Sequence, residues 1–282
     1  MFEEELKMLF MTTGKIDVWN KIKARQEEMD ADDAQELRLF NAQERKRKQK
    51  EQELNEKLLI PERKKFYQQF INAGDLVFDV GANEGNRVQV FLDLNANIVA
   101  VEPQPNCIEI LKQKFDNKII IEQVGLSNES GELEMFIAND STISSFSSEF
   151  IDKTSSGRFS NYSWEHKIKV PVVTLDSLIG KYGIPKFCKI DVEGFELNVL
   201  KGLNHQIPFI SFEYCVPEMQ EKMHECLVQL NKISPNGKFN YSIEETMKLE
   251  LSNWVSFEEF VSISNSNLFV SSLFGDIYFK SI

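Results

Sequence analysis

From Gly74 onward, short apolar runs rich in β-branched residues alternate with stretches whose apolar residues are spaced for helices. Runs of four or five such residues are typical of strands buried on both faces, and intervening helices are typical of βαβ units. We expect strands at 76–80, 98–101, 118–121, 187–190, 208–212, 238–243 and 274–279. This pattern predicts an α/β fold with a seven-stranded, mostly parallel sheet whose last strand is antiparallel.

The first 65 residues have a different character. They contain one Gly and one Pro and are close to neutral, whereas residues 66–282 carry the acidic excess that makes the whole chain −12. We therefore expect an α-helical N-terminal extension, 1–65, followed by the main domain, 66–282. A basic run lies in the extension, at Arg45, Lys46, Arg47, Lys48 and Lys50. This run is either a contact for an anionic partner or a solvated helix face, and the second is the commoner case. The extension is a candidate for contacts with a second copy or another partner.

Composition excludes several classes of function. A net charge of −12 argues against a nucleic-acid partner, since phosphate binding needs a positive field. No apolar run has the length of a membrane-spanning helix. The four cysteines show no C-x-x-C spacing, so neither a zinc site nor a disulfide framework is expected, and reduced thiols fit a cytoplasmic protein.

The turn after the first expected strand contains two glycines. Gly81 and Gly85 are spaced G-x-x-x-G around Ala82 and Asn83, and Asp79 precedes them. Glycine allows close approach of a ligand to the backbone, and amides at a helix start bind anions. We expect the amides of 81–85 to hold a carboxylate while Asp79 faces a cation. The alternative is an ordinary turn with a packing glycine.

An acid also ends the second expected strand, at Glu102, which Pro103 follows. A carboxylate in this position can accept both hydroxyls of a ribose. The alternative is a structural Glu that caps the next helix. Together with the glycine loop, Glu102 favours a ligand that carries a nucleoside.

With these residues placed, the sequence resembles a class I S-adenosylmethionine-dependent methyltransferase, a Rossmann-like fold, and within that class the FkbM family. Five stretches carry the resemblance, in order: 74–85 (GDLVFDVGANEG), 101–103 (VEP), 125–127 (GLS), 173–176 (VTLD) and 189–202 (KIDVEGFELNVLKG). The similarity extends from about residue 61 to 279 and is strongest between 74 and 202. Asn83 stands where the broader class has a glycine, as is normal for FkbM-like members.

The resemblance implies a binding site for S-adenosylmethionine. Its methionine end would lie beside Gly81, Ala82, Asn83 and Gly85 with Asp79 near the ammonium group. Glu102 and Pro103 would lie at the ribose, and Leu126 and Ser127 beside the adenine. Family members commonly methylate hydroxyls of sugars or natural products, so an O-methyltransferase acting on a glycan or small molecule is the leading hypothesis.

Carboxylates follow the fourth and fifth expected strands, where the acceptor should bind. Asp191, Glu193 and Glu213 are the candidate catalytic residues, because a hydroxyl acceptor benefits from a general base. A magnesium ion held by these acids is an alternative that no spacing requires, and we expect no metal site. Glu196 is interpreted as an acid that stabilises the first turn of a helix.

Two further features and the function itself leave alternatives open. The tract 141–146 is rich in hydroxyls and either contacts donor or acceptor or forms a plain turn, and 154–167 is either a lid or a surface loop. The competing function is a catalytically silent scaffold that binds partners through its N-terminal helices. A nicotinamide-dependent oxidoreductase is disfavoured because its G-x-G-x-x-G spacing is missing and Glu84 would oppose a pyrophosphate.

Overall fold

The computed structural model describes residues 7, 11, 16–21, 23–25, 47 and 58–282. The chain divides into two units, Met1–Leu59 and Ile60–Ile282. In the first unit the described residues are helical, and the Lys23 ammonium lies 5.6 Å from the centre of the Trp19 ring. Most of the expected N-terminal extension lies outside the described residues, as does the basic run except for Arg47.

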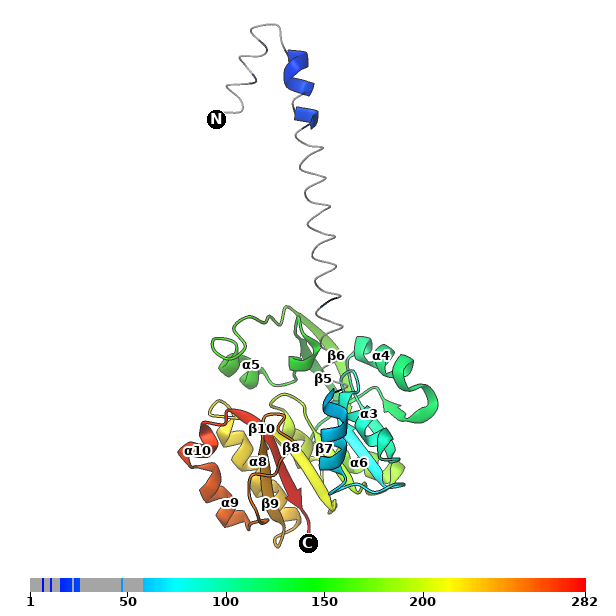
Figure 1. Cartoon of the computed structure of the whole chain (residues 1–282), viewed down its shortest axis with the longest axis vertical. Coiled ribbons are helices and arrows are strands. Elements are labelled where there is room, and N and C mark those ends of the chain that lie inside the picture. Colours follow the sequence, from blue (N-terminus) through cyan, green and yellow to red (C-terminus); the bar gives the residue numbers. More distant parts are fainter. Residues whose placement is uncertain (1–6, 8–10, 12–15, 22, 26–46, 48–57) are drawn as a thin grey trace. The chain divides into compact units, whose positions relative to one another are not determined.

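The second unit is built on a seven-stranded sheet in the order β3-β2-β1-β7-β8-β10-β9 (Figure 1). Its strands are β1 (Leu76–Val80), β2 (Asn97–Val101), β3 (Ile120–Glu122), β7 (Phe187–Ile190), β8 (Phe209–Cys215), β9 (Lys238–Ile243) and β10 (Phe274–Lys280). β10 is antiparallel to its neighbours β8 and β9. The other pairs of neighbours in this sheet, from β3 across to β8, are all parallel. The predicted α/β fold, with a mostly parallel sheet and an antiparallel last strand, is confirmed.

Helices cover both faces of this sheet. One face packs against α6 (Leu175–Tyr182), α7 (Glu196–Lys201), α8 (Gln220–Ile233), α9 (Phe257–Ser264) and α10 (Asn267–Val270). The other face packs against helical residues 58–67, α3 (Asn86–Asp93) and α4 (Pro105–Phe115). Side chains alternate along a strand, so Phe78 and Val80 enter the first core while Val77 enters the second. Asp79, two residues after Val77, therefore faces the second layer.

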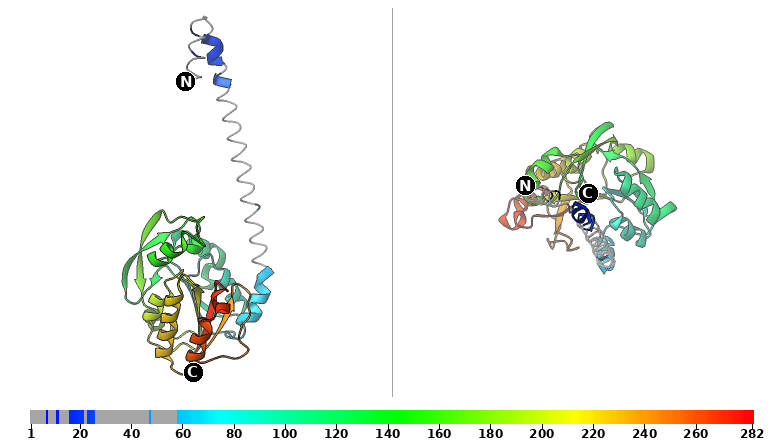
Figure 2. Two further views of the ribbon diagram at one scale, coloured as in Figure 1. Left: turned by 90° about the vertical axis from the view of Figure 1, so that its left-hand side faces the viewer. Right: turned by 90° about the horizontal axis from the view of Figure 1, so that it is seen from above.

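Residues 125–173 form an insertion with its own sheet. The order is β4-β6-β5, from β4 (Gly125–Leu126), β5 (Gly131–Ile137) and β6 (His166–Val173), with η2 (Ser141–Ile143) and α5 (Ser148–Thr154) between β5 and β6. Figures 1 and 2 show the insertion at one end of the domain, at the carboxyl ends of the parallel strands. It is therefore placed to cover the edge at which ligands bind in such sheets.

Three expectations about local structure differ from the fold. β3 begins at Ile120, because a 3-10 turn at Asp116–Lys118 occupies the residues before it. β8 continues to Cys215, because its end pairs with the start of β10. The segment 154–167, interpreted as either a lid or a surface loop, is divided: Thr154 ends α5 and His166 opens β6, and Arg158 between them donates to the carbonyl of Val216 at 2.9 Å.

Gly81 gives a direct test of the packing at the strand ends. It has a φ of +82°, and a Cβ atom there would lie 1.7 Å from the carbonyl oxygen of Asp191. We expect Gly81→Ala to lower the free energy of unfolding by at least about 2 kcal/mol, because left-handed φ and a backbone clash both oppose the methyl group.

Thermal unfolding of the full chain measures this effect, and Gly180→Ala is the matched control. Gly180 lies inside α6, where a methyl group would meet no atom within 4 Å and the φ angle is not positive. This substitution should be neutral or stabilising by up to about 1 kcal/mol. Equal melting temperatures for the two variants would contradict the packing described here.

Candidate active site

The turn between β1 and α3 is held against the end of β2. The amides of Gly81 and Ala82 both donate to the carbonyl of Val101, at 2.9 and 3.1 Å. Gly81, Asn83 and Gly85 all have positive φ, and a Cβ atom on Gly85 would lie 2.3 Å from the Phe115 ring. Packing therefore requires a glycine at both positions, as the alternative interpretation held. The same packing fixes the turn at the carboxyl edge of the sheet.

All five amides of residues 81–85 donate to acceptors within the chain. Besides the two bonds to Val101, Asn83 donates to Glu102 Oε2 at 2.9 Å, Glu84 to Asn83 Oδ1 at 2.7 Å and Gly85 to Ala82 at 2.8 Å. The turn therefore offers a ligand acceptors, its carbonyl oxygens, rather than the free amides that we expected to hold a carboxylate. Acceptors suit an ammonium group.

Asp79 lies behind this turn with 2% of its surface exposed. Its Oδ2 atom is buried and has no hydrogen-bond partner among the described residues. Burial raises the pKa of Asp79 to about 6, against the opposing fields of Lys189 and Arg87. A buried carboxyl oxygen without a partner fits a cationic ligand group, because such a group would supply the missing hydrogen bond.

Glu102 is also buried, and both of its carboxyl oxygens are used. Oε2 accepts from the amide of Asn83, and Oε1 accepts from the amide of Gln104 at 2.8 Å, just before α4. Burial raises the pKa of Glu102 to about 7, although these hydrogen bonds oppose it. Glu102 thus joins the two strand-end turns, and each oxygen keeps a second lone pair for a ligand hydroxyl.

The other residues expected at the ribose and the adenine have different surroundings from one another. Pro103 is half-buried beside Glu102, and Ser127 is buried, with its amide donating to Val173 at 2.9 Å. Leu126 belongs to β4 of the second sheet and packs in the larger core with 2% exposure. Its side chain therefore supports the site from within, since the chain leaves the main sheet after Glu122.

Asp191, Glu193 and Glu213 come together at the ends of β7 and β8. One carboxylate oxygen from each residue lies within 4.8 Å of the corresponding oxygens of the other two. Asp191 and Glu193 follow β7, whereas Glu213 lies within β8 and pairs in register with Asp276 of β10. Glu213 was expected just after its strand, and the extension of β8 by pairing with β10 accounts for the difference.

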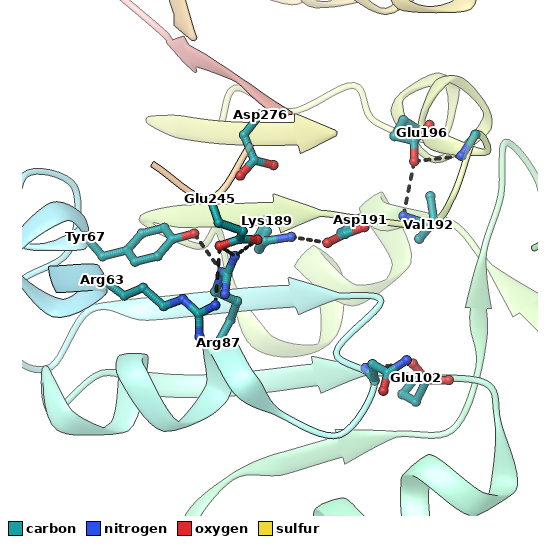
Figure 3. Close-up of polar contacts among 12 residues, drawn as sticks. Arg63, Tyr67, Arg87, Glu102, Lys189, Asp191, Val192, Glu196, Glu245 and Asp276 are labelled. Atoms are coloured by element: carbon teal, nitrogen blue, oxygen red, sulfur yellow. Dashed lines mark hydrogen bonds and ion pairs between the residues drawn. The ribbon is translucent and has the colours of Figure 1, made fainter. Parts of the chain in front are cut away.

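These acids differ in their surroundings. Burial, and then the neighbouring carboxylate of Asp191, raises the pKa of Glu193 well above its usual range. Burial is also the main cause that raises the pKa of Glu213 well above its usual range, and the neighbouring acids add to it. Asp191 instead accepts a hydrogen bond at Oδ2 from the ammonium of Lys189, at 2.5 Å (Figure 3). Two carboxyls of the cluster therefore favour the protonated form, and the third is ion-paired.

The turn that carries Asp191 and Glu193 is fixed by Glu196. One oxygen, Oε1, accepts from the amides of Val192 and Gly194, both at 3.1 Å (Figure 3). Ser145 of the insertion donates to the carbonyl of Glu193 at 2.6 Å. Glu196 thus stabilises the turn before α7 as well as lying in the first turn of that helix.

The hydroxyl-rich tract of the insertion reaches both halves of the site. Ser141 lies beside Asn83, with its hydroxyl 3.2 Å from the side-chain amide nitrogen, and its carbonyl accepts from the Gln104 side chain at 3.0 Å. Ser145, four residues on, contacts Glu193 as described. The tract therefore spans from the turn after β1 to the carboxylate cluster.

Within the described part of the chain, the three carboxylates are the group whose ligand atoms come close enough to share a metal ion.

Comparison with known proteins decides the family. A family model described as the methyltransferase FkbM domain matches residues 79–259. The chain belongs to the FkbM methyltransferase family. The resemblance seen in the sequence is confirmed, and with it the expectation of a methyltransferase domain that uses S-adenosylmethionine.

A curated relative of this FkbM methyltransferase matches about half of the chain at low identity. The hexuronic acid methyltransferase AglP of Haloferax volcanii is 29% identical over 143 residues, which cover 49% of this chain and 54% of AglP. The chain thus spans about half the length of this curated relative.

Solved structures resemble the FkbM methyltransferase at low identity. A TehB-like SAM-dependent methyltransferase from Corynebacterium glutamicum is 9% identical with a TM-score of 0.39, covering 78% of this chain and 88% of its own. The plantazolicin methyltransferase BpumL, in complex with an analogue and SAH, is 9% identical with a TM-score of 0.41, covering 82% and 87%.

Sequence reasoning missed the residues that support the cluster, above all Lys189 and Ser145. Lys189 carried a usable signal, because it interrupts the apolar run Phe187–Ile190 that we took as a strand buried on both faces. A charged residue inside such a strand needs a buried partner. Ser145 carried none beyond the general richness of its tract in hydroxyls.

Glu196 gives a prediction about pH and stability. Burial raises the pKa of its carboxyl to about 7 from an unfolded value of 4.5, so its contribution is full below pH 4.5 and is lost as pH rises to about 7. Glu196→Gln keeps an oxygen that can accept from Val192 and Gly194 but cannot ionise. Relative to the native chain, this variant should gain on the order of 5 °C in melting temperature between pH 5 and pH 8.

Thermal unfolding at the two pH values measures this gain, with Glu221→Gln on the exposed start of α8 as control. The control should show the same offset from the native chain at both pH values. A pH-independent offset for Glu196→Gln as well would mean that burial does not hold the Glu196 carboxyl in its neutral form.

Proposed function

We propose that this protein is an S-adenosylmethionine-dependent O-methyltransferase whose acceptor is a hydroxyl of a sugar, glycan or small metabolite. The observation that carries the proposal is the cluster of Asp191, Glu193 and Glu213 within 4.8 Å at the carboxyl edge of an FkbM methyltransferase domain. The hexuronic acid methyltransferase AglP supports a glycan acceptor as the first class to examine.

S-adenosylmethionine supplies a methyl group on a positively charged sulfur. In our assignment Asp79 and the carbonyls of the turn at Gly81, Ala82, Asn83 and Gly85 bind its ammonium end. Glu102 and Pro103 bind the ribose, and Ser127 lies at the adenine with Leu126 beneath it. The orphaned Oδ2 of Asp79 is the feature that best fits this assignment.

The acidity of the site favours a hydroxyl over a carboxylate as acceptor. A carboxylate acceptor would be repelled by the ionised member of the cluster and would need no base, since it is already an anion. A hydroxyl is a poor nucleophile and gains from a base within hydrogen-bond reach. Protonated Glu193 and Glu213 can in addition donate hydrogen bonds to neighbouring oxygens of a sugar.

Asp191 is the base in this mechanism. The acceptor oxygen forms the new bond to the methyl carbon, the electron pair of the broken carbon–sulfur bond stays on sulfur, and the hydroxyl proton passes to Asp191. Asp191 then releases the proton to water. Its side chain is 34% exposed and is therefore open to solvent, and Lys189 donates to Oδ2.

The setting of the enzyme is part of the proposal. No helix in the described part of the chain is long and apolar enough to cross a membrane. All four cysteines are free and buried, which fits the reducing cytoplasm. We assign partner or self-association to the extension expected at 1–65, of which residues 60–65 belong to the same compact unit as the domain at 66–282.

Transfer of an isotopically labelled methyl group tests the proposed function. The full chain is incubated with labelled S-adenosylmethionine and a panel of neutral glycans, uronate-containing glycans and small polyols. Label in the product should survive mild alkali, because a methyl ether resists the hydrolysis that cleaves a methyl ester. Alkali-labile product would place the methyl group on a carboxylate, and failure to bind the donor at millimolar concentration would contradict the function altogether.

Replacement of the base makes the mechanism specific. We expect Asp191→Asn to lower kcat by roughly 100- to 10,000-fold, the usual contribution of general-base catalysis, with donor affinity changed little. Steady-state kinetics and calorimetric titration of the donor measure the two quantities. Asp152→Asn, on the exposed side of α5, should leave both at the native level. Native turnover in Asp191→Asn would remove Asp191 from the mechanism.

A further inference from the structure

A buried ion pair lies directly beneath the proposed base. Lys189 is in the interior of β7, and 3% of its side chain is exposed, against 34% for Asp191. The two residues are two positions apart, so their side chains leave the same face of the sheet. The ammonium donates to Asp191 Oδ2 at 2.5 Å (Figure 3).

Other ionisable groups surround Lys189 from each neighbouring element. Asp79 of β1 is its register partner, Asp276 lies on β10, and Tyr67 belongs to helical residues 58–67. Arg87 of α3 is the other nearby cation, and it donates to Glu245 after β9 and to the Tyr67 hydroxyl. Glu193 and Glu213 complete the surroundings on the side of the acceptor.

The acids near Lys189 differ in how strongly each can balance its positive charge. Burial raises the pKa of Asp79 to about 6 and also raises that of Asp276, so each is a weaker counter-charge for Lys189 than an ordinary aspartate. Arg87 is engaged by Glu245. Burial alone would lower the pKa of Lys189. The fields of Asp191 and Asp276 outweigh burial, so the pKa lies above its ordinary value. Lys189 therefore stays protonated and neither gives nor takes the proton of the reaction. Within the described residues, its ammonium donates one hydrogen bond, to Asp191.

We infer that Lys189 is the positioning residue of the methyl transfer: its ammonium binds Oδ2 of Asp191, fixes the side chain and leaves the other oxygen for the acceptor. This inference rests on the proposed function. Asp191 alone takes the acceptor proton, and Lys189 acts only through Asp191. The close approach of the Gly81 turn to the Asp191 carbonyl holds the backbone of the base, and Lys189 holds its side chain.

Three variants test the inference on the full chain. Lys189→Met keeps much of the side-chain volume without the charge, and Lys189→Arg keeps the charge. Lys181→Met is the matched control, because Lys181 forms an equally short 2.5 Å ion pair with Glu122 but on the exposed rim of the domain. Melting temperature and calorimetric donor affinity are recorded for each, so that loss of folding is separated from loss of chemistry.

Kinetics over pH 5–9 give the decisive readout. In Lys189→Met, kcat at pH 7 should fall at least roughly 100-fold and the acid limb of its pH profile should move up by about 1 to 3 units, because a missing cation favours protonation of the base. Donor affinity should change less than about threefold. Lys189→Arg should recover most of kcat, and Lys181→Met should match the native enzyme. A uniform fall in kcat without movement of the limb, or a native profile in Lys189→Met, would overturn the inference.

A second measurement does not depend on turnover. Carbon-detected NMR of protein labelled at aspartate carboxyls follows the Asp191 signal, assigned from its loss in Asp191→Asn. That signal should titrate at a higher pH in Lys189→Met than in the native chain. Identical titration in the two proteins would overturn the inference even if methyl transfer is observed. If the native chain transfers no methyl group to any acceptor while the NMR shift is present, the proposed function fails and the coupling of the two residues stands.

Discussion

The contact between Gly81 and the backbone of Asp191 is the constraint on which the site depends. β1 and β7 are neighbours at the centre of the sheet, and the turns that leave them meet where only a glycine fits. The turn proposed to hold the donor and the carboxylate proposed as base are thereby joined through main-chain atoms. Relative placement of reacting groups is the main contribution that a protein makes to a direct displacement. Here it follows from the strand order itself.

Much of this arrangement could be predicted from the sequence because it depends on local patterns. Strand composition located the main sheet, and the rule that ligands bind beyond the carboxyl ends of parallel strands brought Asp191, Glu193 and Glu213 into one group. These inferences need only the direction of each strand. They do not require the contacts between distant side chains, which a periodic pattern leaves open.

Features decided by long-range packing were harder to foresee. Glu213 lies inside β8 because β10, about 60 residues later, pairs with its end. The amides of 81–85 donate to Val101, to Glu102 and to acceptors within the turn itself, so the turn offers carbonyls where free donors were expected. Lys189 stood visibly out of place in an apolar strand, but only the folded chain identifies Asp191 as the residue that compensates it.

The insertion at 125–173 has a consequence for how such a domain can diverge. Its chain departs after β3 and returns ahead of α6, and its strands form a sheet that shares no ladder with the main one in the described part of the chain. Side-chain contacts such as those of Ser141 and Ser145 join it to the strand ends, and Leu126 and Phe150 pack in cores shared with the rest of the domain. Lengthening or exchanging this segment alters the roof of the site without altering a single pairing of the seven strands. We expect selectivity for the acceptor to change with this segment, while Asp191 and the turn after β1 stay on the main sheet.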